Sequence, residues 1–156
     1  MEAALDRLVS AEEIRGLMFR YAELVDGARF NEIGELFAHG RITTGDEGTE
    51  VASGADAVAG LYRTTNKVHP DGTLRTRHLT TNITVEVDVE RHAAEASATF
   101  VVLQATDRLP LQPIVTGRYR DRFARGPGGW RFAERRAAID LVGDTSRHLR
   151  RAPPGS

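Results

Sequence analysis

Residues 77–89 have the sequence RHLTTNITVEVDV. From Ile83 onward aliphatic residues alternate with polar ones, and this period of two is typical of a β-strand with one buried face. Three more stretches rich in Val, Ile, Thr and aromatic residues follow, at residues 94–106, 114–125 and 130–141. Their connections are short, so strands adjacent in sequence are expected to lie side by side in an antiparallel sheet.

The residues before this sheet have a helical period instead. Between residues 10 and 25 the apolar side chains recur every three or four positions, and Ser10 with Glu13 forms a capping-box pattern. We therefore predict a first helix from Ser10 to Val25, which ends at Gly27 because glycine tolerates the left-handed conformation. Further predicted elements are a short helix around residues 30–37, a hairpin of residues 41–44 and 49–52, and an Ala-rich helix over residues 54–63.

Helices that precede strands define the α+β class, here with a curved sheet wrapped around the helices. The 156 residues fit one domain, which we place at residues 1–149, followed by a flexible tail at 150–156. The 21 basic and 22 acidic residues give a net charge of -1, which disfavours nucleic acid and anionic membranes as partners. The chain has no cysteine and no apolar run of about 18 residues, and we expect a cytoplasmic protein.

Three residues are candidates for chemistry. Tyr21 lies on the apolar stripe of the first helix, so its ring faces the interior; a core tyrosine is the structural alternative. Asp26 lies about 140° further round the helix, and shares a pocket with Tyr21 only if the helix has loosened there. The alternative for Asp26 is a solvated carboxylate at the helix end. His78 begins the first long strand, where a neutral imidazole can accept a proton and a carboxylate can orient it.

Strict alternation conflicts with a site at His78. It places His78, Thr80 and Thr84 on the face opposite to Ile83 and Val85. Either a bulge near the threonines reverses the alternation, or both faces of the sheet are buried.

Further residues are candidates for the wall of a substrate pocket, with core packing as the alternative: Met18, Phe100, Tyr119, Trp130 and Arg136. Gln104 is a candidate hydrogen-bond partner of a ligand, with an edge-strand amide as the alternative. A polar cluster after the last strand either caps the pocket mouth or is a plain loop; it consists of Asp140, Asp144, Ser146 and His148. The histidines are scattered, and no phosphate-binding glycine motif occurs. We therefore expect neither a metal nor a cofactor.

Several segments together resemble the SnoaL-like branch of the nuclear-transport-factor-2-like superfamily. They are RYAELVDG (20–27), TRHLTTN (76–82), GRYRDRF (117–123), GGWRFAERR (128–136) and DLVGDTSRHL (140–149). The resemblance covers nearly the whole chain and implies a cone-shaped α+β barrel. Within the superfamily the chain looks most similar to the group of scytalone dehydratase, bile acid 7α-dehydratase and hexachlorocyclohexane dehydrochlorinase.

That group shares an Asp–His pair in a conical pocket, and the resemblance puts the pair on Asp26 and His78. The tyrosine of the dehydratases falls on Tyr21. A second acid of the bile acid enzyme falls on Gln104, which has no acid function. The resemblance also implies a homo-oligomer, a trimer rather than a dimer, formed through the outer face of the sheet.

Three functions remain open from the sequence. The first is a cofactor-independent lyase of the dehydratase kind that acts on an apolar, cyclic, hydroxylated or carbonyl substrate, with His78 as base, Asp26 as its partner and Tyr21 as a hydrogen-bond donor. The second is an isomerase or polyketide cyclase with the same base. The third is a non-catalytic module for ligand binding or assembly.

Overall fold

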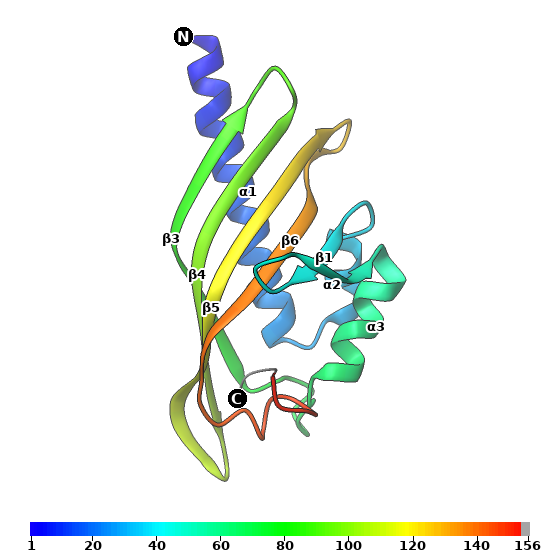
Figure 1. The fold of residues 1–156 in the computed structure, drawn as a ribbon, viewed down its shortest axis with the longest axis vertical. Coiled ribbons are helices and arrows are strands. Elements are labelled where there is room, and N and C mark those ends of the chain that lie inside the picture. Colours follow the sequence, from blue (N-terminus) through cyan, green and yellow to red (C-terminus); the bar gives the residue numbers. More distant parts are fainter. Residues whose placement is uncertain (154–156) are drawn as a thin grey trace.

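The computed structural model describes residues 1–153, which form three helices and six strands (Figure 1). In chain order they are α1 (Glu2–Asp26), α2 (Phe30–Leu36), β1 (Arg41–Thr44), β2 (Thr49–Ser53), α3 (Ala55–Thr65), β3 (Thr76–Asp88), β4 (Ala93–Thr106), β5 (Leu109–Gly126) and β6 (Gly129–Val142). All the elements expected from the sequence are present. None of the helices in this part of the chain has an apolar stretch long enough to span a bilayer.

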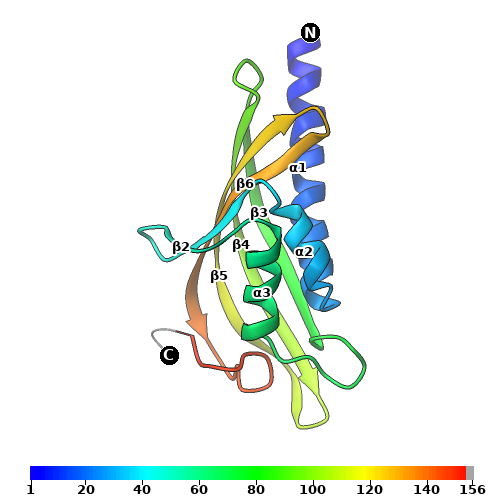
Figure 2. The same cartoon turned by 90° about the vertical axis from the view of Figure 1, so that its right-hand side faces the viewer.

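The six strands form one mixed sheet in the order β2-β1-β6-β5-β4-β3. Neighbours pair antiparallel except β1 and β6, which run parallel. The helices lie on one face of the strongly twisted sheet, with α1 running along the long strands (Figures 1 and 2). This arrangement confirms the predicted α+β fold with helices packed in a curved sheet. The inner face of the sheet is the face that these helices cover.

Helix α1 begins eight residues earlier than predicted, and the left-handed residue that follows it is not the expected glycine. Ser10, expected as the N-cap, is buried within the helix, and its hydroxyl lies 3.4 Å from Asp6 Oδ1. At the other end Gly27 has a φ of -80°, and the left-handed residue is Ala28, with a φ of 52°. The N–H groups of Ala28 and Arg29 donate to carbonyls of the last turn, a pattern that ends helices with a left-handed residue.

A bulge in β3 resolves the conflict over the alternation. The register of β3 against β4 shifts between Thr81 and Thr84, and Asn82 has a φ of 53°. As a result His78, opposite buried Val102, lies on the same inner face as Val85, opposite buried Ala96. The extra residue reverses the alternation, as the first of the two alternatives required.

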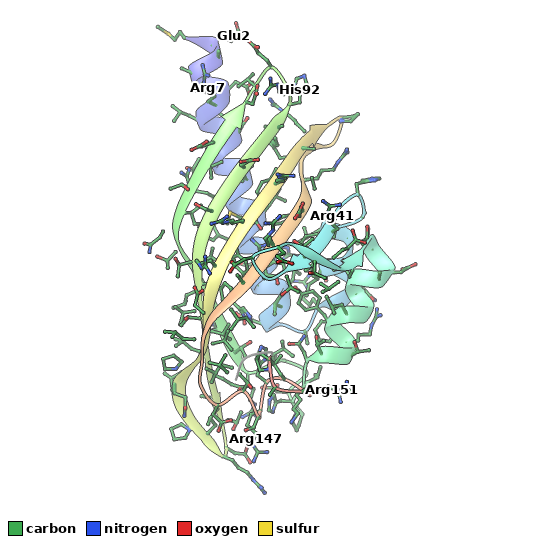
Figure 3. All side chains as sticks on the ribbon, viewed as in Figure 1. Glu2, Arg7, Arg41, His92, Arg147 and Arg151 are labelled. Atoms are coloured by element: carbon green, nitrogen blue, oxygen red, sulfur yellow. The ribbon has the colours of Figure 1, made fainter. Side chains whose placement is uncertain are left out.

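The core fills the space between the inner face and the helices, where Figure 3 shows the densest side chains. Its largest fully buried apolar residues are Phe37, Phe123, Phe132, Ile14 and Met18. The segment after β6 lies at the end of the molecule away from the N-terminus, as labelled Arg147 marks in Figure 3.

Part of the expected flexible tail is tied to the fold. The N–H of Arg150 donates to the carbonyl of Thr65, and its Nε donates to the carbonyl of Asn66. Pro153 is also buried. The remainder of the tail, residues 154–156, lies outside the described residues.

Candidate active site

Asp26 and His78 form a close pair between the end of α1 and the start of β3. His78 Nδ1 lies 2.6 Å from Asp26 Oδ1, and the two side chains are only 9% and 11% exposed. The backbone N–H of His78 also donates to both carboxylate oxygens, at 3.2 and 3.0 Å, and the Thr76 hydroxyl donates to Oδ1 at 2.7 Å. The structure therefore brings together the two residues that the sequence singled out for the pair.

This environment keeps Asp26 ionised. Burial acts to raise the pKa of Asp26, but the hydrogen bonds and charge of His78 and the hydrogen bond of Thr76 together lower it below its ordinary value. A carboxylate can only accept hydrogen bonds, so His78 Nδ1 must carry the donated proton. In the neutral imidazole, Nε2 then has a free lone pair. His78 is thus arranged as a base with a fixed tautomer.

Tyr21 belongs to a second, neighbouring group. Its ring is buried, as predicted, and its hydroxyl is hydrogen-bonded to that of Tyr62 on α3. Burial and the neighbouring Tyr21 raise the pKa of Tyr62 well above its ordinary value, so Tyr62 stays protonated at neutral pH. The rings of Phe37 and Tyr119 contact Tyr21 edge to face, at 6.3 and 6.1 Å between centroids.

A buried ion pair lies beneath these rings. Arg135 donates to Asp121 through Nε at 3.0 Å and Nη2 at 2.6 Å, and both side chains are at most 1% exposed. The guanidinium carbon lies 4.2 Å from the centroid of Tyr21 and 3.8 Å from that of Tyr119. Nη1 is buried, and none of the described residues forms a hydrogen bond with it. Burial raises the pKa of Asp121, against the opposing effect of Arg135.

Arg135 of this ion pair occupies the inward position that was expected for Arg136 in the pocket wall. Continuing the inward alternation of Trp130 and Phe132 along β6 would bring residue 136 inward. The register of β5 against β6 shifts between Arg122 and Phe123, and this irregularity turns Arg135 inward and Arg136 outward. Arg136 lies on the outer face beside Glu134, so it cannot line a site at His78.

Trp130 also lies away from the pair. His78 is opposite Val102, and the row continues across the sheet through Val115 to Val142. Trp130 is at the other end of β6, roughly 40 Å along the strand at the usual rise per residue. It is buried there beside Arg125, and its Nε1 has no hydrogen-bond partner within residues 1–153. Its expected place in the pocket wall is therefore corrected.

Phe100, Tyr119 and Met18 are buried on the inner side. Phe100 pairs with Thr80, one inward position from His78, and its ring stacks on Tyr119 at 4.4 Å between centroids. Phe100 therefore lies between the Asp26–His78 pair and the tyrosine group. A contact of these residues with substrate stays a prediction.

Gln104 joins two segments next to the pair. It is 1% exposed, and its Nε2 donates to the carbonyls of Leu74 and Arg147, at 3.0 and 3.1 Å. Its Oε1 is buried and has no hydrogen-bond partner in the described part of the chain. The amide nitrogen has a structural role in this arrangement, and any role in substrate binding falls to Oε1.

The sequence missed two contributors to the site. Tyr62 follows Val58 by four residues on the buried side of α3, and this helical spacing is a signal that could have identified it. His148 was named only as part of a polar cluster, yet it is 5% exposed and its ring centroid lies 6.0 Å from that of His78.

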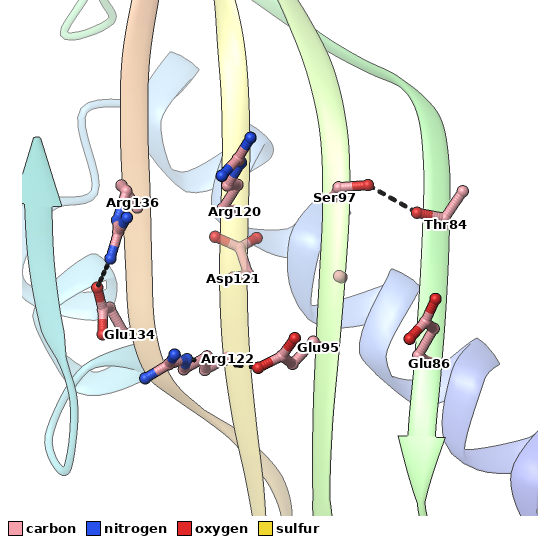
Figure 4. Close-up of a pocket in the computed structure, with 10 residues that line it drawn as sticks. Thr84, Glu86, Glu95, Ser97, Arg120, Asp121, Arg122, Glu134 and Arg136 are labelled. Carbon is pink, nitrogen blue, oxygen red and sulfur yellow. Dashed lines mark hydrogen bonds and ion pairs between the residues drawn. The ribbon is translucent and has the colours of Figure 1, made fainter. Parts of the chain in front are cut away.

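One surface hollow lies near these residues, and another lies on the outer face of the sheet. One, of about 620 Å³, opens at the β3 edge and is lined in part by Asp26, Thr76 and Gln104. The other, of about 370 Å³, lies on the outer face and is lined by charged side chains such as Glu95 and Arg120 (Figure 4). Within residues 1–153, no group of three or more His, Asp and Glu side chains is placed to hold a metal ion. The hollow at the β3 edge is lined by Asp26 of the Asp–His pair but not by His78.

Helices packed in a curved mixed sheet, with a buried Asp–His pair at the helix end, indicate a protein of the nuclear-transport-factor-2-like class. Residues 6–136 match the model of the SnoaL-like domain, and the chain belongs to this family. No curated protein matches the sequence.

Solved structures with the same fold include proteins of unknown or only proposed function. One is a protein of the same fold class from Novosphingobium aromaticivorans, with 26% identity, a TM-score of 0.74 and coverage of 94% of this chain and 91% of the other. Another is Rv3472 of Mycobacterium tuberculosis, of unknown function, with 24% identity, a TM-score of 0.72 and coverage of 91% and 78%. A third is a candidate scytalone dehydratase from Novosphingobium aromaticivorans, with 23% identity, a TM-score of 0.70 and coverage of 96% of both chains.

Proposed function

We propose that this protein is a cofactor-independent lyase that removes water from a cyclic carbonyl substrate with a hydroxyl group at the β carbon. The observation that carries the proposal is the contact of His78 Nδ1 with the ionised Asp26 carboxylate, which leaves Nε2 as a base of fixed orientation. The family includes dehydratases and cyclases, and the candidate scytalone dehydratase shares the fold. The chemistry itself is argued from the pair.

The reaction begins with proton removal. Nε2 of His78 takes a proton from the carbon next to the carbonyl, and the electron pair of the C–H bond moves to the carbonyl oxygen to form an enolate. Asp26 stabilises the imidazolium that results. As the enolate collapses, the C–O bond at the β carbon breaks, and the departing hydroxyl receives the proton from His78 and leaves as water. The base returns to its neutral state without a cofactor.

Tyr21 is assigned the second polar role in this reaction. Its hydroxyl would polarise the carbonyl or assist the departing hydroxyl. Tyr62 supports it, because a hydrogen bond between the two hydroxyls orients Tyr21 inside the core.

The test is turnover of a panel of cyclic β-hydroxy ketones by the parent protein and three variants. We expect His78→Asn, which lacks a base at the Nε2 position, to reduce kcat by at least about a hundredfold. Asp26→Asn should lower kcat strongly as well, since an amide no longer stabilises the imidazolium. His39→Asn, at an exposed histidine in the turn after α2, serves as the control and should keep full activity.

Product masses separate the alternatives. Loss of one water supports the lyase, whereas turnover without a change in mass indicates an isomerase or a cyclase that uses the same base. Saturable binding without turnover indicates a binding module. Full activity of a folded His78→Asn variant excludes His78 as the base.

A further inference from the structure

His148 is a buried histidine for which the mechanism above has no use. It lies in the segment after β6 and is 5% exposed. Its ring meets the ring of His78 at an interplanar angle of 64°, with 6.0 Å between centroids. Its Nδ1 is buried and has no hydrogen-bond partner among residues 1–153. A buried polar atom without a partner is costly and rare, so this atom calls for an explanation.

The backbone around His148 is held firmly. The N–H of His148 donates to the carbonyl of Thr145 at 3.0 Å, and its own carbonyl accepts from the N–H of Lys67 at 2.8 Å. The preceding carbonyl, of Arg147, is contacted by Gln104 Nε2 at 3.1 Å and by His69 Nε2 at 2.9 Å. These contacts fix the segment against the sheet and the loop after α3, and within residues 1–153 none of them uses the Nδ1 of His148.

The surroundings keep the imidazole of His148 uncharged. Burial lowers its pKa most, the neighbouring His78 lowers it further, Asp26 acts in the opposite direction and His69 adds a small lowering; the result is a pKa of about 4. A neutral imidazole carries one N–H donor and one acceptor. Unlike His78, His148 forms no hydrogen bond to a carboxylate within residues 1–153.

We propose that His148 is a second catalytic imidazole, which stays neutral and hydrogen-bonds through Nδ1 to the substrate oxygen on which negative charge develops. This rests on the proposed function, because the charge arises when His78 removes a proton from the adjacent carbon. That carbon and the carbonyl oxygen are two bonds apart. Because the two imidazole rings are in edge contact, His78 can contact the carbon while His148 contacts the oxygen. His148 transfers no proton; it donates a hydrogen bond that becomes stronger as the enolate forms. Neutral imidazoles are known to act as such electrophiles in enolate chemistry.

The test uses 2-naphthol as a planar mimic of the enolate, and requires no turnover. The first measurement is the ¹⁵N NMR signal of the His148 ring with and without 2-naphthol. The second is the dissociation constant for the parent protein and for His148→Phe and His148→Asn. Phenylalanine keeps a ring of similar size without nitrogen, whereas the asparagine amide nitrogen lies near the position of Nδ1.

We expect 2-naphthol to shift the Nδ1 signal of His148. His148→Phe should weaken binding by about tenfold or more, as expected for the loss of a hydrogen bond to a partly charged oxygen. His148→Asn should restore most of the affinity. His69→Leu removes one contact to the Arg147 carbonyl, while the contact of Gln104 and the backbone bonds of His148 remain, so this variant is the control and should bind like the parent.

Three outcomes would overturn the assignment. They are unchanged affinity in a folded His148→Phe variant, an Nδ1 signal that does not respond to bound 2-naphthol, and no saturable binding up to millimolar concentration. If His69→Leu loses as much affinity as His148→Phe, the effect belongs to the segment and the assignment also fails. The lyase proposal fails separately, when His78→Asn keeps its turnover.

Discussion

The carboxylate of Asp26 accepts hydrogen bonds from three donor groups of strand β3. It accepts from the ring of His78, from the backbone N–H of the same residue and from the hydroxyl of Thr76. The hydrogen bond from the backbone N–H of His78 fixes the distance between the helix end and the strand. Because of this, less side-chain freedom is lost when the imidazole forms its own hydrogen bond to Asp26. The family resemblance predicted the pair, whereas the residues alone left Asp26 as a possible solvated carboxylate and His78 on an undecided face of the sheet.

The low pKa of His148 has a consequence for stability. An unfolded histidine takes up its proton near pH 6.5, whereas His148 in the folded protein does so near pH 4. Between these values the unfolded state binds more protons, so the free energy of unfolding falls as the pH is lowered. The total loss from this group is on the order of 3 kcal/mol as an upper limit.

Urea unfolding at several pH values across this window measures the effect. His148→Phe should flatten the pH dependence, whatever its stability at neutral pH. Asp26, with its lowered pKa, contributes stability that is lost only at more acidic pH, so it does not mask the slope. Identical slopes for the parent and for His148→Phe would contradict the prediction.

At the scale of elements, two strand irregularities decide which side chains reach the site. In β3 the sequence contains a visible conflict, because His78 and the aliphatic row fall on opposite faces, and this conflict indicated a bulge. In β6 the sequence shows no such conflict. Alternation from Phe132 is consistent with Arg136 as the inward residue, although the irregularity turns Arg135 inward. A bulge depends on how a strand pairs with its neighbour. It can therefore be predicted from sequence only where it disrupts the alternation of apolar and polar residues.

The bulge in β3 can be tested at Asn82. Its φ of 53° suits glycine and asparagine and is strained for a β-branched residue. We expect Asn82→Gly to fold with nearly unchanged stability and Asn82→Val to lose about 1–2 kcal/mol in urea unfolding. Thr81→Val, at the exposed neighbouring position, is the matched control and should lose far less. Equal stability of the two valine variants would show that the bulge imposes no strain.

At the scale of the whole molecule, the outer face of the sheet is a candidate surface for self-association. It carries Glu86 and Glu95 on one side and Arg120 and Arg122 on the other, around the hollow of Figure 4. Leu79 and Leu141 add exposed apolar area on strands of the same sheet. Arg122 lies 3.5 Å from Glu95 in the same chain, and such exposed charges of both signs allow two copies to pair acid with base.

We expect a homo-oligomer, a trimer as the family resemblance implies, and light scattering coupled to size exclusion measures it. Arg120→Glu places like charges in the contact and should shift the protein towards monomer. Arg91→Glu, at an exposed position in the turn between β3 and β4, is the control and should leave the assembly intact. A monomeric parent protein would refute the expectation, and a dimer would correct its stoichiometry.

Strand β3 is the last strand of the sheet, so the side that carries the His78 N–H has no neighbouring strand. Edge strands with free N–H groups invite pairing with other chains. Asp26 accepts a hydrogen bond from this N–H, which a neighbouring strand would otherwise satisfy, at the residue whose imidazole must be held in place. A chain that lost this carboxylate would lose the orientation of its base and, in the same step, part of its protection against aggregation.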